Sequence, residues 1–163
     1  MRYVTEKGLM NGTSASTFSP DAAMTRAMMV TLLWRMEKEP AELKSNFTDL
    51  TADWYRTAVD WAAETGVVNG VGNGKFAPNA TLSLEQLITI LYRYAENKGY
   101  NVSKSASLDS FTDSSAVSAY AKPAIQWAVG MNFLSGNTLT PCAPASRAQI
   151  AQVLMLFCKA YIK

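Results

Sequence analysis

Histidine is absent from this 163-residue chain, and cysteine is scarce, with two residues. Without histidine the chain lacks the commonest general base and the commonest metal-binding side chain near neutral pH. Cys142 precedes the cap at Ser146 by four residues, and Cys158 lies twelve residues beyond that cap. A disulfide would require the loop to fold back along the predicted helix, so we favour two unpaired thiols without a shared metal site. No paired carboxylates at a recognisable spacing, nucleophile motif or cofactor fingerprint compensates for these absences. We therefore expect a non-catalytic protein without cofactor or metal.

Long hydrophobic runs and a strong charge of either sign are also missing. No apolar stretch approaches the roughly 20 residues that a membrane-spanning helix needs. The formal charge is +2, and no block of Lys and Arg indicates a nucleic-acid-binding surface. The first residues lack the apolar core of an export signal, so we expect any such signal upstream of residue 1. We predict neither a membrane span nor a nucleic-acid partner.

One pattern, in contrast, occurs three times. Each copy has a turn bounded by Gly or Asn, then a Phe-x-Pro or Leu-x-Pro motif, then a Thr or Ser that suits a helix N-cap. The turns span 8–12, 66–70 and 132–136, the motifs begin at Phe18, Phe76 and Leu139, and the caps are Thr25, Ser83 and Ser146. The first residue of each turn, Gly8, Gly66 or Asn132, is predicted to adopt a left-handed conformation. Three helices should begin directly after the caps.

Apolar residues follow each cap at offsets of four, seven, eight and eleven, which is the stripe of an amphipathic α-helix. They are Met29, Leu32, Leu33 and Met36, then Leu87, Ile90, Leu91 and Tyr94, then Ile150, Val153, Leu154 and Phe157. A second repeated helix carries Trp54, Ala58, Trp61 and Ala62, matched by Tyr120, Ala124, Trp127 and Ala128. Helical spacing places most of these aromatics in the core and leaves Trp34 as the candidate exposed aromatic. The fold class predicted is all-α.

The repeats also define the predicted organisation. They occupy residues 1–40, 47–100 and 111–163, with polar linkers between them. Tyr3 aligns with Trp61 and Trp127, so the first copy lacks the start of its first helix, and we expect the chain to be a piece of a longer protein. A single helix pair is too small to bury a stable core. We therefore predict one structural domain of three helix-turn-helix units.

Two arginines are the strongest candidates for a binding site. Thr25-Arg26-Ala27 and Ser146-Arg147-Ala148 each place a guanidinium just inside a helix start, beside unpaired backbone N–H groups and the positive end of the helix dipole. That combination favours an anion. From one copy alone, a solvated Arg that opens a helix is the better interpretation.

Two aspartates recur at one place in their units, in Phe47-Thr-Asp49 and Phe111-Thr-Asp113. Each precedes an aromatic-bearing helix. On residue type we favour a helix-entry turn or cap, and a role in a binding groove is the alternative.

The Phe-x-Asp motif, the aromatic helix, the Gly-x-x-x-Gly turn, Phe-x-Pro and Thr-Arg-Ala together resemble the S-layer homology repeat, here in a tandem of three. The resemblance implies a pseudo-threefold spindle whose grooves bind secondary cell-wall polysaccharide, often pyruvylated, at the surface of a Gram-positive cell. It implies an extracellular, non-catalytic anchor. It also implies the glycan-binding residues, which are Arg26 and Arg147 with Thr25 and Ser146, then Asp49, Asp113, Gly12, Gly70 and Gly136, and Trp34 as an exposed aromatic.

The chain departs from the family pattern in ways that limit this prediction. Leu84 stands where the second copy should have Arg, and the usual Glu of the motif is Met28, Gln86 and Gln149 in the three copies. At most two grooves should therefore bind an anion. An upstream segment or a neighbouring chain would have to complete the first copy. The alternative function is a degenerate tandem that serves as a protein-interaction or assembly scaffold, through an apolar patch at Met1, Tyr3 and Val4.

Overall fold

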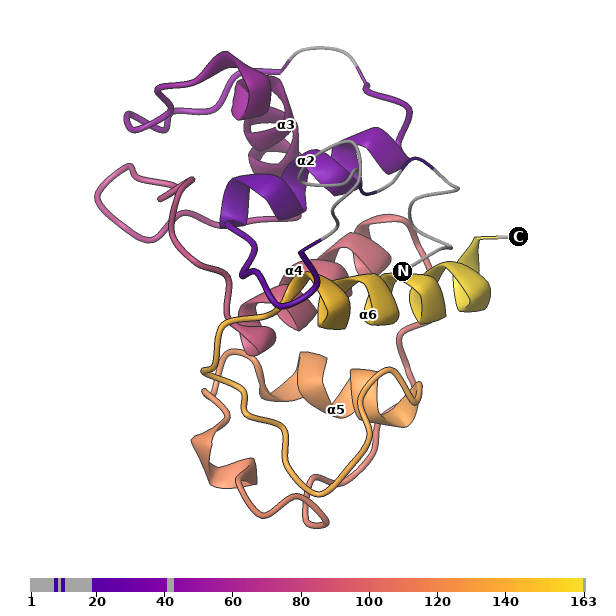
Figure 1. Ribbon diagram of the computed structural model, residues 1–163. Helices are drawn as coiled ribbons and strands as arrows, with labels where there is room; N and C mark the ends of the chain where they lie inside the picture. Colours follow the sequence, from indigo (N-terminus) through magenta and orange to yellow (C-terminus); the bar gives the residue numbers. More distant parts are fainter. Residues whose placement is uncertain (1–7, 9, 11–18, 41–42, 163) are drawn as a thin grey trace.

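The computed structural model describes residues 8, 10, 19–40 and 43–162. Within these ranges the chain forms α-helices and one short 3-10 helix, and it contains no strand, which confirms the all-α prediction. The elements are α2 (Arg26–Met36), α3 (Asp53–Glu64), α4 (Leu84–Asn97), η1 (Ser114–Ala116), α5 (Lys122–Gly130) and α6 (Arg147–Tyr161). Figure 1 shows their arrangement.

The three predicted caps are confirmed. The hydroxyls of Thr25, Ser83 and Ser146 accept hydrogen bonds from the third N–H of α2, α4 and α6, at 3.3, 3.3 and 3.2 Å. The Gln86 and Gln149 side chains in turn accept from the cap N–H groups, which completes both predicted capping boxes. Each cap satisfies donors that the start of an α-helix leaves without an intrahelical partner. The sequence therefore fixes where these three helices begin.

The predicted apolar stripes form the core. All twelve stripe residues are buried except Met36, which is half-buried against the same core. Phe157 of α6 lies at the centre of an aromatic cluster, with ring centroids of Tyr94, Trp127, Phe133 and Tyr161 within 6.4 Å. Gly8, Gly66 and Asn132 have φ values of 67°, 75° and 57°, so the predicted left-handed turns are confirmed.

A closed ring of backbone hydrogen bonds joins the three repeats at the residues just before the caps. The Met24 N–H donates to Ala145, the Ala145 N–H donates to Leu82, and the Leu82 N–H donates to Met24, at 3.3, 2.8 and 2.9 Å. All three side chains are buried. Each repeat therefore receives one bond from its neighbour and gives one to the other, which is the cyclic symmetry predicted for the fold.

The first amides of each capped helix also bond to the next repeat. In α2, the Arg26 N–H donates to Ala80 and the Ala27 N–H donates to Pro78, both at 3.0 Å. The equivalent donors of α4 and α6 bond to the equivalent carbonyls, at 2.9–3.0 Å, through Ala143 and Pro141 and through Ala22 and Pro20. The prediction that these amides are available to an anion is therefore wrong, because protein carbonyls already occupy them.

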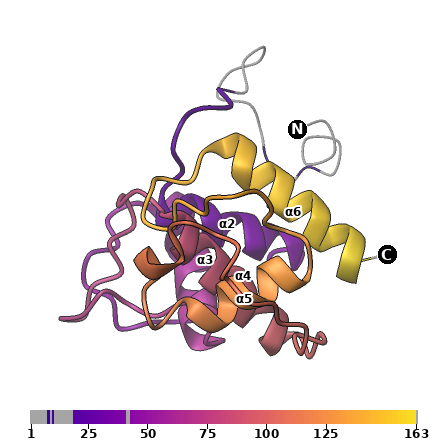
Figure 2. The same ribbon diagram turned by 90° about the horizontal axis from the view of Figure 1, so that it is seen from below.

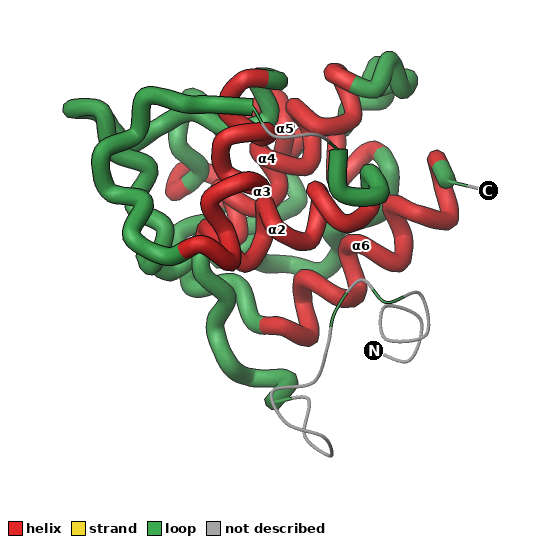
Figure 3. The backbone as a smooth tube through the Cα atoms, turned by 90° about the horizontal axis from the view of Figure 1, so that it is seen from above, coloured by secondary structure: helices red, strands yellow, loops and turns green. Residues whose placement is uncertain are grey.

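Helix packing crosses the repeat boundaries as well. The helix α3 packs along α2, and α5 packs along α4, so each of these pairs joins the second helix of one repeat to the first helix of the next. In Figure 1, α4 and α6 cross the middle of the molecule, with α2 and α3 on one side and α5 on the other. Figures 2 and 3 show α6 along one side of the other helices, beside long connecting loops. A repeat therefore buries its apolar faces against its neighbours.

This interlocking predicts a single cooperative unfolding transition. The backbone of Leu82 is part of the ring, and its side chain is fully buried. Replacing Leu82 by Ala should lower the free energy of unfolding by about 2–5 kcal/mol without splitting the transition. Urea titrations followed by both circular dichroism and tryptophan fluorescence measure this. The control Leu43→Ala, at an exposed position, should change stability by less than about 0.5 kcal/mol. Separate transitions for the two probes would contradict the interlocked arrangement.

Candidate functional site

Three cavities occupy equivalent places between successive repeats. Groove A, about 320 Å³, is lined by Arg26 of α2, the turn 68–71, one face of α4 that includes Arg93, and Tyr120. Groove C, about 150 Å³, is lined by Arg147 of α6, Met10, one face of α2 that includes Arg35, and Trp54. Groove B, about 280 Å³, is lined by Leu84 of α4, the segment 133–140 and one face of α6. Each groove is thus built from at least two repeats.

The arginines occur in pairs across the grooves. One of each pair directly follows a cap, and the other lies ten residues after the cap of the next repeat. Groove A combines Arg26 with Arg93, and groove C combines Arg147 with Arg35. Sequence analysis missed Arg35 and Arg93, although their shared offset from Thr25 and Ser83 was readable. The pairing itself could not be read before the fold showed which repeats face each other.

Arg26 crosses from the first repeat into the second. Its Nε donates to the Phe76 carbonyl and its Nη2 to the Asn69 carbonyl, both at 2.9 Å, and its guanidinium lies 4.7 Å from the Phe76 ring centroid. Only 6% of the residue is exposed. Burial is the main cause that lowers the pKa of Arg26; Tyr120 and Asp49 oppose it, and the positive charge of Arg93 adds to it. Because arginine stays protonated in proteins, the groove retains its positive charge, with Nη1 free of hydrogen bonds to the described residues.

Arg147 occupies the equivalent position at the start of α6. It is buried, and burial lowers the pKa of its guanidinium. Both predicted arginines therefore lie in inter-repeat grooves and not in open solvent. Thr25 and Ser146 serve as the caps beside them, with their hydroxyls committed to the helix starts.

Asp49 and Asp113 hold the Phe-x-Pro and Leu-x-Pro turns. The two oxygens of Asp49 accept from the N–H groups of Phe76 and Ala77, at 2.9 and 2.8 Å. Asp113 accepts in the same way from Leu139 and Thr140, at 2.8 and 2.7 Å. The favoured interpretation, a helix-entry turn or cap, is wrong in its cap half for α3 and α5, whose N-caps are Ala52 and Ala121. Asp113 does stand at the N-cap of η1, but its side chain makes no cap bond there.

These carboxylates stabilise strained turns. The middle residues of the turns, Ala77 and Thr140, have φ values of 57° and 50°, a conformation that costs free energy for residues other than glycine. Burial opposes ionisation of Asp49, but its two backbone donors outweigh it and lower its pKa. The backbone donors of Leu139 and Thr140 lower the pKa of Asp113. The sequence alone did not show these bonds, which span 26–28 residues.

The exposed aromatic side chains beside the grooves are Trp54 and Tyr120, and not the predicted Trp34. Trp34 is half-buried, and its indole N–H donates to the Pro40 carbonyl at 3.1 Å. Trp54 and Tyr120, which helical spacing assigned mainly to the core, are each 53% exposed and border grooves C and A. Trp54 is the second residue of α3, whereas Tyr120 lies two residues before α5 begins, so its predicted place in a helix is wrong. Trp61 and Trp127, each seven residues further along, are buried as predicted.

A buried carboxylate fixes Tyr120. Glu85, which stands where the other two repeats have Ala27 and Ala148, is only 5% exposed. It accepts from the Ser118 N–H at 3.0 Å, the Ser118 hydroxyl at 2.7 Å and the Tyr120 hydroxyl at 3.0 Å. Burial, followed by this bond and the negative charge of Glu85, raises the pKa of Tyr120 to about 12. The phenol therefore stays protonated beside groove A.

The predicted glycines differ in their roles. Gly70 lines groove A, and a Cβ there would lie 2.6 Å from both the Lys75 carbonyl oxygen and the Phe47 ring. Gly136 has φ +118°, which only glycine adopts readily. Gly12 lies outside the described residues. Within the described ranges no cluster of metal-ligating side chains occurs, and no helix is long and apolar enough to cross a membrane.

The cyclic helical fold with grooves between its repeats defines a three-repeat helical module. Residues 1–28, 46–88 and 110–151 match the S-layer homology domain. The chain belongs to the S-layer homology domain family, as the resemblance predicted, and it is a module of the cell surface.

The chain is similar to parts of much longer proteins. It is 33% identical over 156 residues to an endoglucanase of Bacillus sp. (strain KSM-635), which covers 91% of this chain and 16% of that protein. It is 30% identical over 160 residues to the surface-layer 125 kDa protein of Lysinibacillus sphaericus, covering 94% of this chain and 13% of that one. A cellulosome-anchoring protein of Acetivibrio thermocellus is 25% identical over 107 residues, covering 62% and 24%.

The turn carboxylates predict acid sensitivity. Because the pKa of each is lowered in the folded state, the stability they provide is present above the ordinary carboxyl pKa of 3.8 and is lost as the pH falls through the folded value. The double variant Asp49→Asn/Asp113→Asn should therefore melt below wild type at neutral pH, and the difference should shrink in acid. Thermal melts across pH measure this. Asp109→Asn, at an exposed position, serves as control, and a difference that is independent of pH would contradict the assignment.

Replacing Glu85 should release Tyr120. In Glu85→Gln the negative acceptor is gone, so the pKa of Tyr120 should fall from about 12 toward the ordinary 10. Titration of proteins labelled at the tyrosine ring carbon, with Tyr120→Phe to assign the signal, measures the shift. Glu64→Gln, at an exposed site, should leave it unchanged. An unchanged pKa in Glu85→Gln would show that the bond does not form in solution.

Proposed function

We propose that this module anchors a larger protein to the bacterial cell wall by binding an anionic secondary wall polysaccharide in grooves A and C. The observation that carries the proposal is the pairing of two arginines with one exposed aromatic in each of these grooves. Guanidinium groups bind carboxylates through charge-assisted hydrogen bonds, and an aromatic face packs against the C–H face of a sugar. A pyruvylated sugar carries both features.

The preorganisation of groove A supports this proposal. Arg26 is fixed by two carbonyls and by the Phe76 ring, and Tyr120 is fixed by Glu85, so neither side chain has to be ordered when a ligand binds. Arg93, on the face of α4 that lines groove A, adds a second positive charge. Gly70 lines the groove, and its backbone packs too closely against Lys75 and Phe47 for a side chain. Asp49 contributes indirectly, through its hydrogen bonds to the turn that carries Phe76.

By analogy with the relatives, we infer that this module is one part of a larger protein. The chain spans about a sixth or less of the first relatives it matches, which include an endoglucanase and a surface-layer protein. We infer that the module itself is non-catalytic and that any enzyme activity belongs to another part of the protein. We also infer that an upstream segment or a neighbouring chain completes the first repeat.

The alternative is a scaffold that binds another protein. Its predicted contact residues, Met1, Tyr3 and Val4, lie outside the described residues. The paired arginines of grooves A and C instead favour the glycan anchor.

Co-sedimentation with purified Gram-positive wall sacculi tests the proposal. Arg35→Gln/Arg93→Gln removes one guanidinium from each cationic groove while leaving Arg26 and its structural bonds intact. We expect loss of pelleting by about tenfold or more, and the same loss when the polysaccharide is stripped from the walls.

Lys104→Gln/Lys122→Gln gives the matched control, because it removes the same charge from exposed sites outside the grooves. Its pelleting should match wild type. Equal losses of pelleting in both variants would show that wall binding depends on net charge alone and not on the grooves. Full pelleting of the arginine variant would overturn the assignment of the grooves.

A further inference from the structure

We propose that groove B is a subsite for an uncharged, hydroxyl-bearing sugar unit, distinct from the anion-binding grooves A and C. The inference rests on the proposed glycan-binding function and adds a difference in ligand class between equivalent grooves. It starts from the two positions that carry arginine in grooves A and C. At the equivalent positions for groove B both residues are leucine: Leu84, which follows the cap of α4 and lines the groove, and Leu156, which lies ten residues after the cap of α6 and packs against the core.

The described lining of groove B contains no charged side chain. A carboxylate that entered it would lose hydration and gain no counter-charge, which is unfavourable. The paired substitution therefore excludes an anion, whereas a single lost arginine would have left one cation in place.

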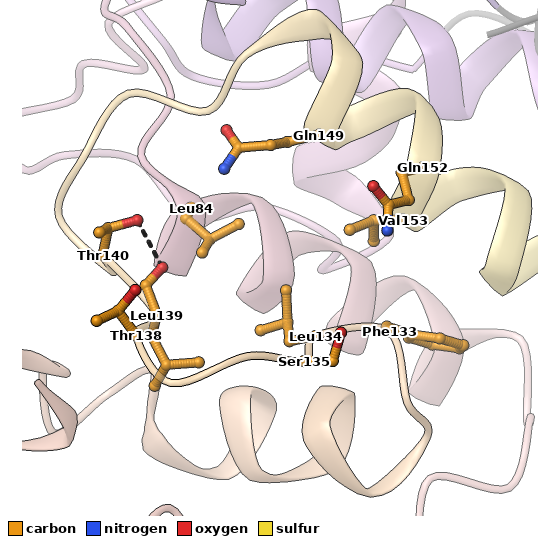
Figure 4. A pocket seen from close by; sticks show the side chains of 10 residues that line it. All are labelled: Leu84, Phe133, Leu134, Ser135, Thr138, Leu139, Thr140, Gln149, Gln152 and Val153. Carbon is orange, nitrogen blue, oxygen red and sulfur yellow. Dashed lines mark hydrogen bonds between the residues drawn. The ribbon is translucent and has the colours of Figure 1, made fainter. Parts of the chain in front are cut away.

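The backbone of groove B is adapted to the missing arginine. In groove A the Phe76 carbonyl accepts from Arg26 at 2.9 Å. The equivalent carbonyl in groove B belongs to Leu139, and it accepts from the Thr140 hydroxyl at 2.7 Å, as Figure 4 shows. The residue equivalent to Thr140 is Ala77 in the second repeat, which has no hydroxyl, and Ser19 in the first, which has one. A hydroxyl thus replaces a guanidinium as donor, so no acceptor is left without a partner.

The remaining surface offers neutral hydrogen bonds above an apolar floor. Gln149 and Gln152 project from α6 toward the loop that carries Thr138, and Leu84 enters from α4 below them (Figure 4). Gln149 uses its side-chain oxygen in the capping box, and its amide NH₂ makes no hydrogen bond among the described residues. Amides, a hydroxyl and an aliphatic floor match the hydroxyl edge and the C–H face of a pyranose. The volume, about 280 Å³, is close to that of groove A, about 320 Å³.

Nuclear magnetic resonance titrations with small sugars test the inference on the intact chain. The neutral probes are cellobiose and N,N′-diacetylchitobiose, and the anionic probe is glucuronate. We expect at least one of the neutral sugars to shift the resonances of the Gln152 side-chain amide and of the Ser135 and Thr138 backbone amides, with a dissociation constant of about 1–10 mM. Added salt should not weaken this binding, because no ion pair is involved. Glucuronate should leave these signals in place.

Two variants make the assignment specific. Gln152→Ala, at an exposed site, should weaken binding of the neutral sugar at least about threefold, whereas Gln126→Ala on α5, outside the three grooves, should not. Leu84→Arg should introduce salt-sensitive glucuronate binding at groove B and reduce binding of the neutral sugar. A thermal melt tests whether Leu84→Arg is folded. If Leu84→Arg is unfolded, the surface variant Gln152→Ala alone decides whether groove B binds the neutral sugar.

The inference is overturned if neither neutral sugar shifts groove B, if Gln152→Ala binds as wild type does, or if glucuronate binds there in the unmodified protein. These outcomes are separable from the wall-binding test. Wall pelleting that depends on Arg35 and Arg93, with no neutral sugar at groove B, would retain the anchor and reject the subsite. Neutral binding at groove B without wall pelleting would do the reverse.

Discussion

The closed ring of backbone hydrogen bonds through Met24, Leu82 and Ala145 is the constraint on which the rest of the structure depends. It places each capped helix so that its first two amides bond to the loop of the next repeat. Helix starts elsewhere leave such donors to water or to a ligand. Here they hold the repeats together, so the proposed anion binding rests on the arginine side chains that follow the caps and not on the backbone.

The same ring explains why the grooves are shared between repeats. A residue that follows the cap of one repeat faces the turn and the second helix of the next, so one groove combines positions that are far apart in the sequence. Arg26 therefore meets Arg93, and Leu84 lies on the side of α6 that carries Gln149 and Gln152. Sequence differences between the repeats therefore occur together at the positions that belong to one groove. Grooves A and C keep both arginines, whereas the equivalent positions for groove B are leucines, and there the Thr140 hydroxyl donates to the Leu139 carbonyl.

Local features of this fold were predictable from sequence, and features that cross repeats were not. The caps Thr25, Ser83 and Ser146, the apolar stripes and the left-handed Asn132 depend on neighbours within a few turns, and all were confirmed. The bonds of Asp49 to a turn 27 residues away, the exposure of Trp54 and the pairing of Arg26 with Arg93 depend on tertiary placement. The helix-dipole argument for an anion failed because it treated one helix alone, without the neighbouring repeat that bonds to its amides.

Native-state hydrogen exchange tests the ring most directly. If Met24, Leu82 and Ala145 hold the three repeats as one unit, their amides should exchange only through global unfolding. All three should then report the same free energy, equal to that from urea denaturation. Faster exchange at one of them, with a free energy below the global value, would show that a repeat opens on its own and would contradict the closed ring.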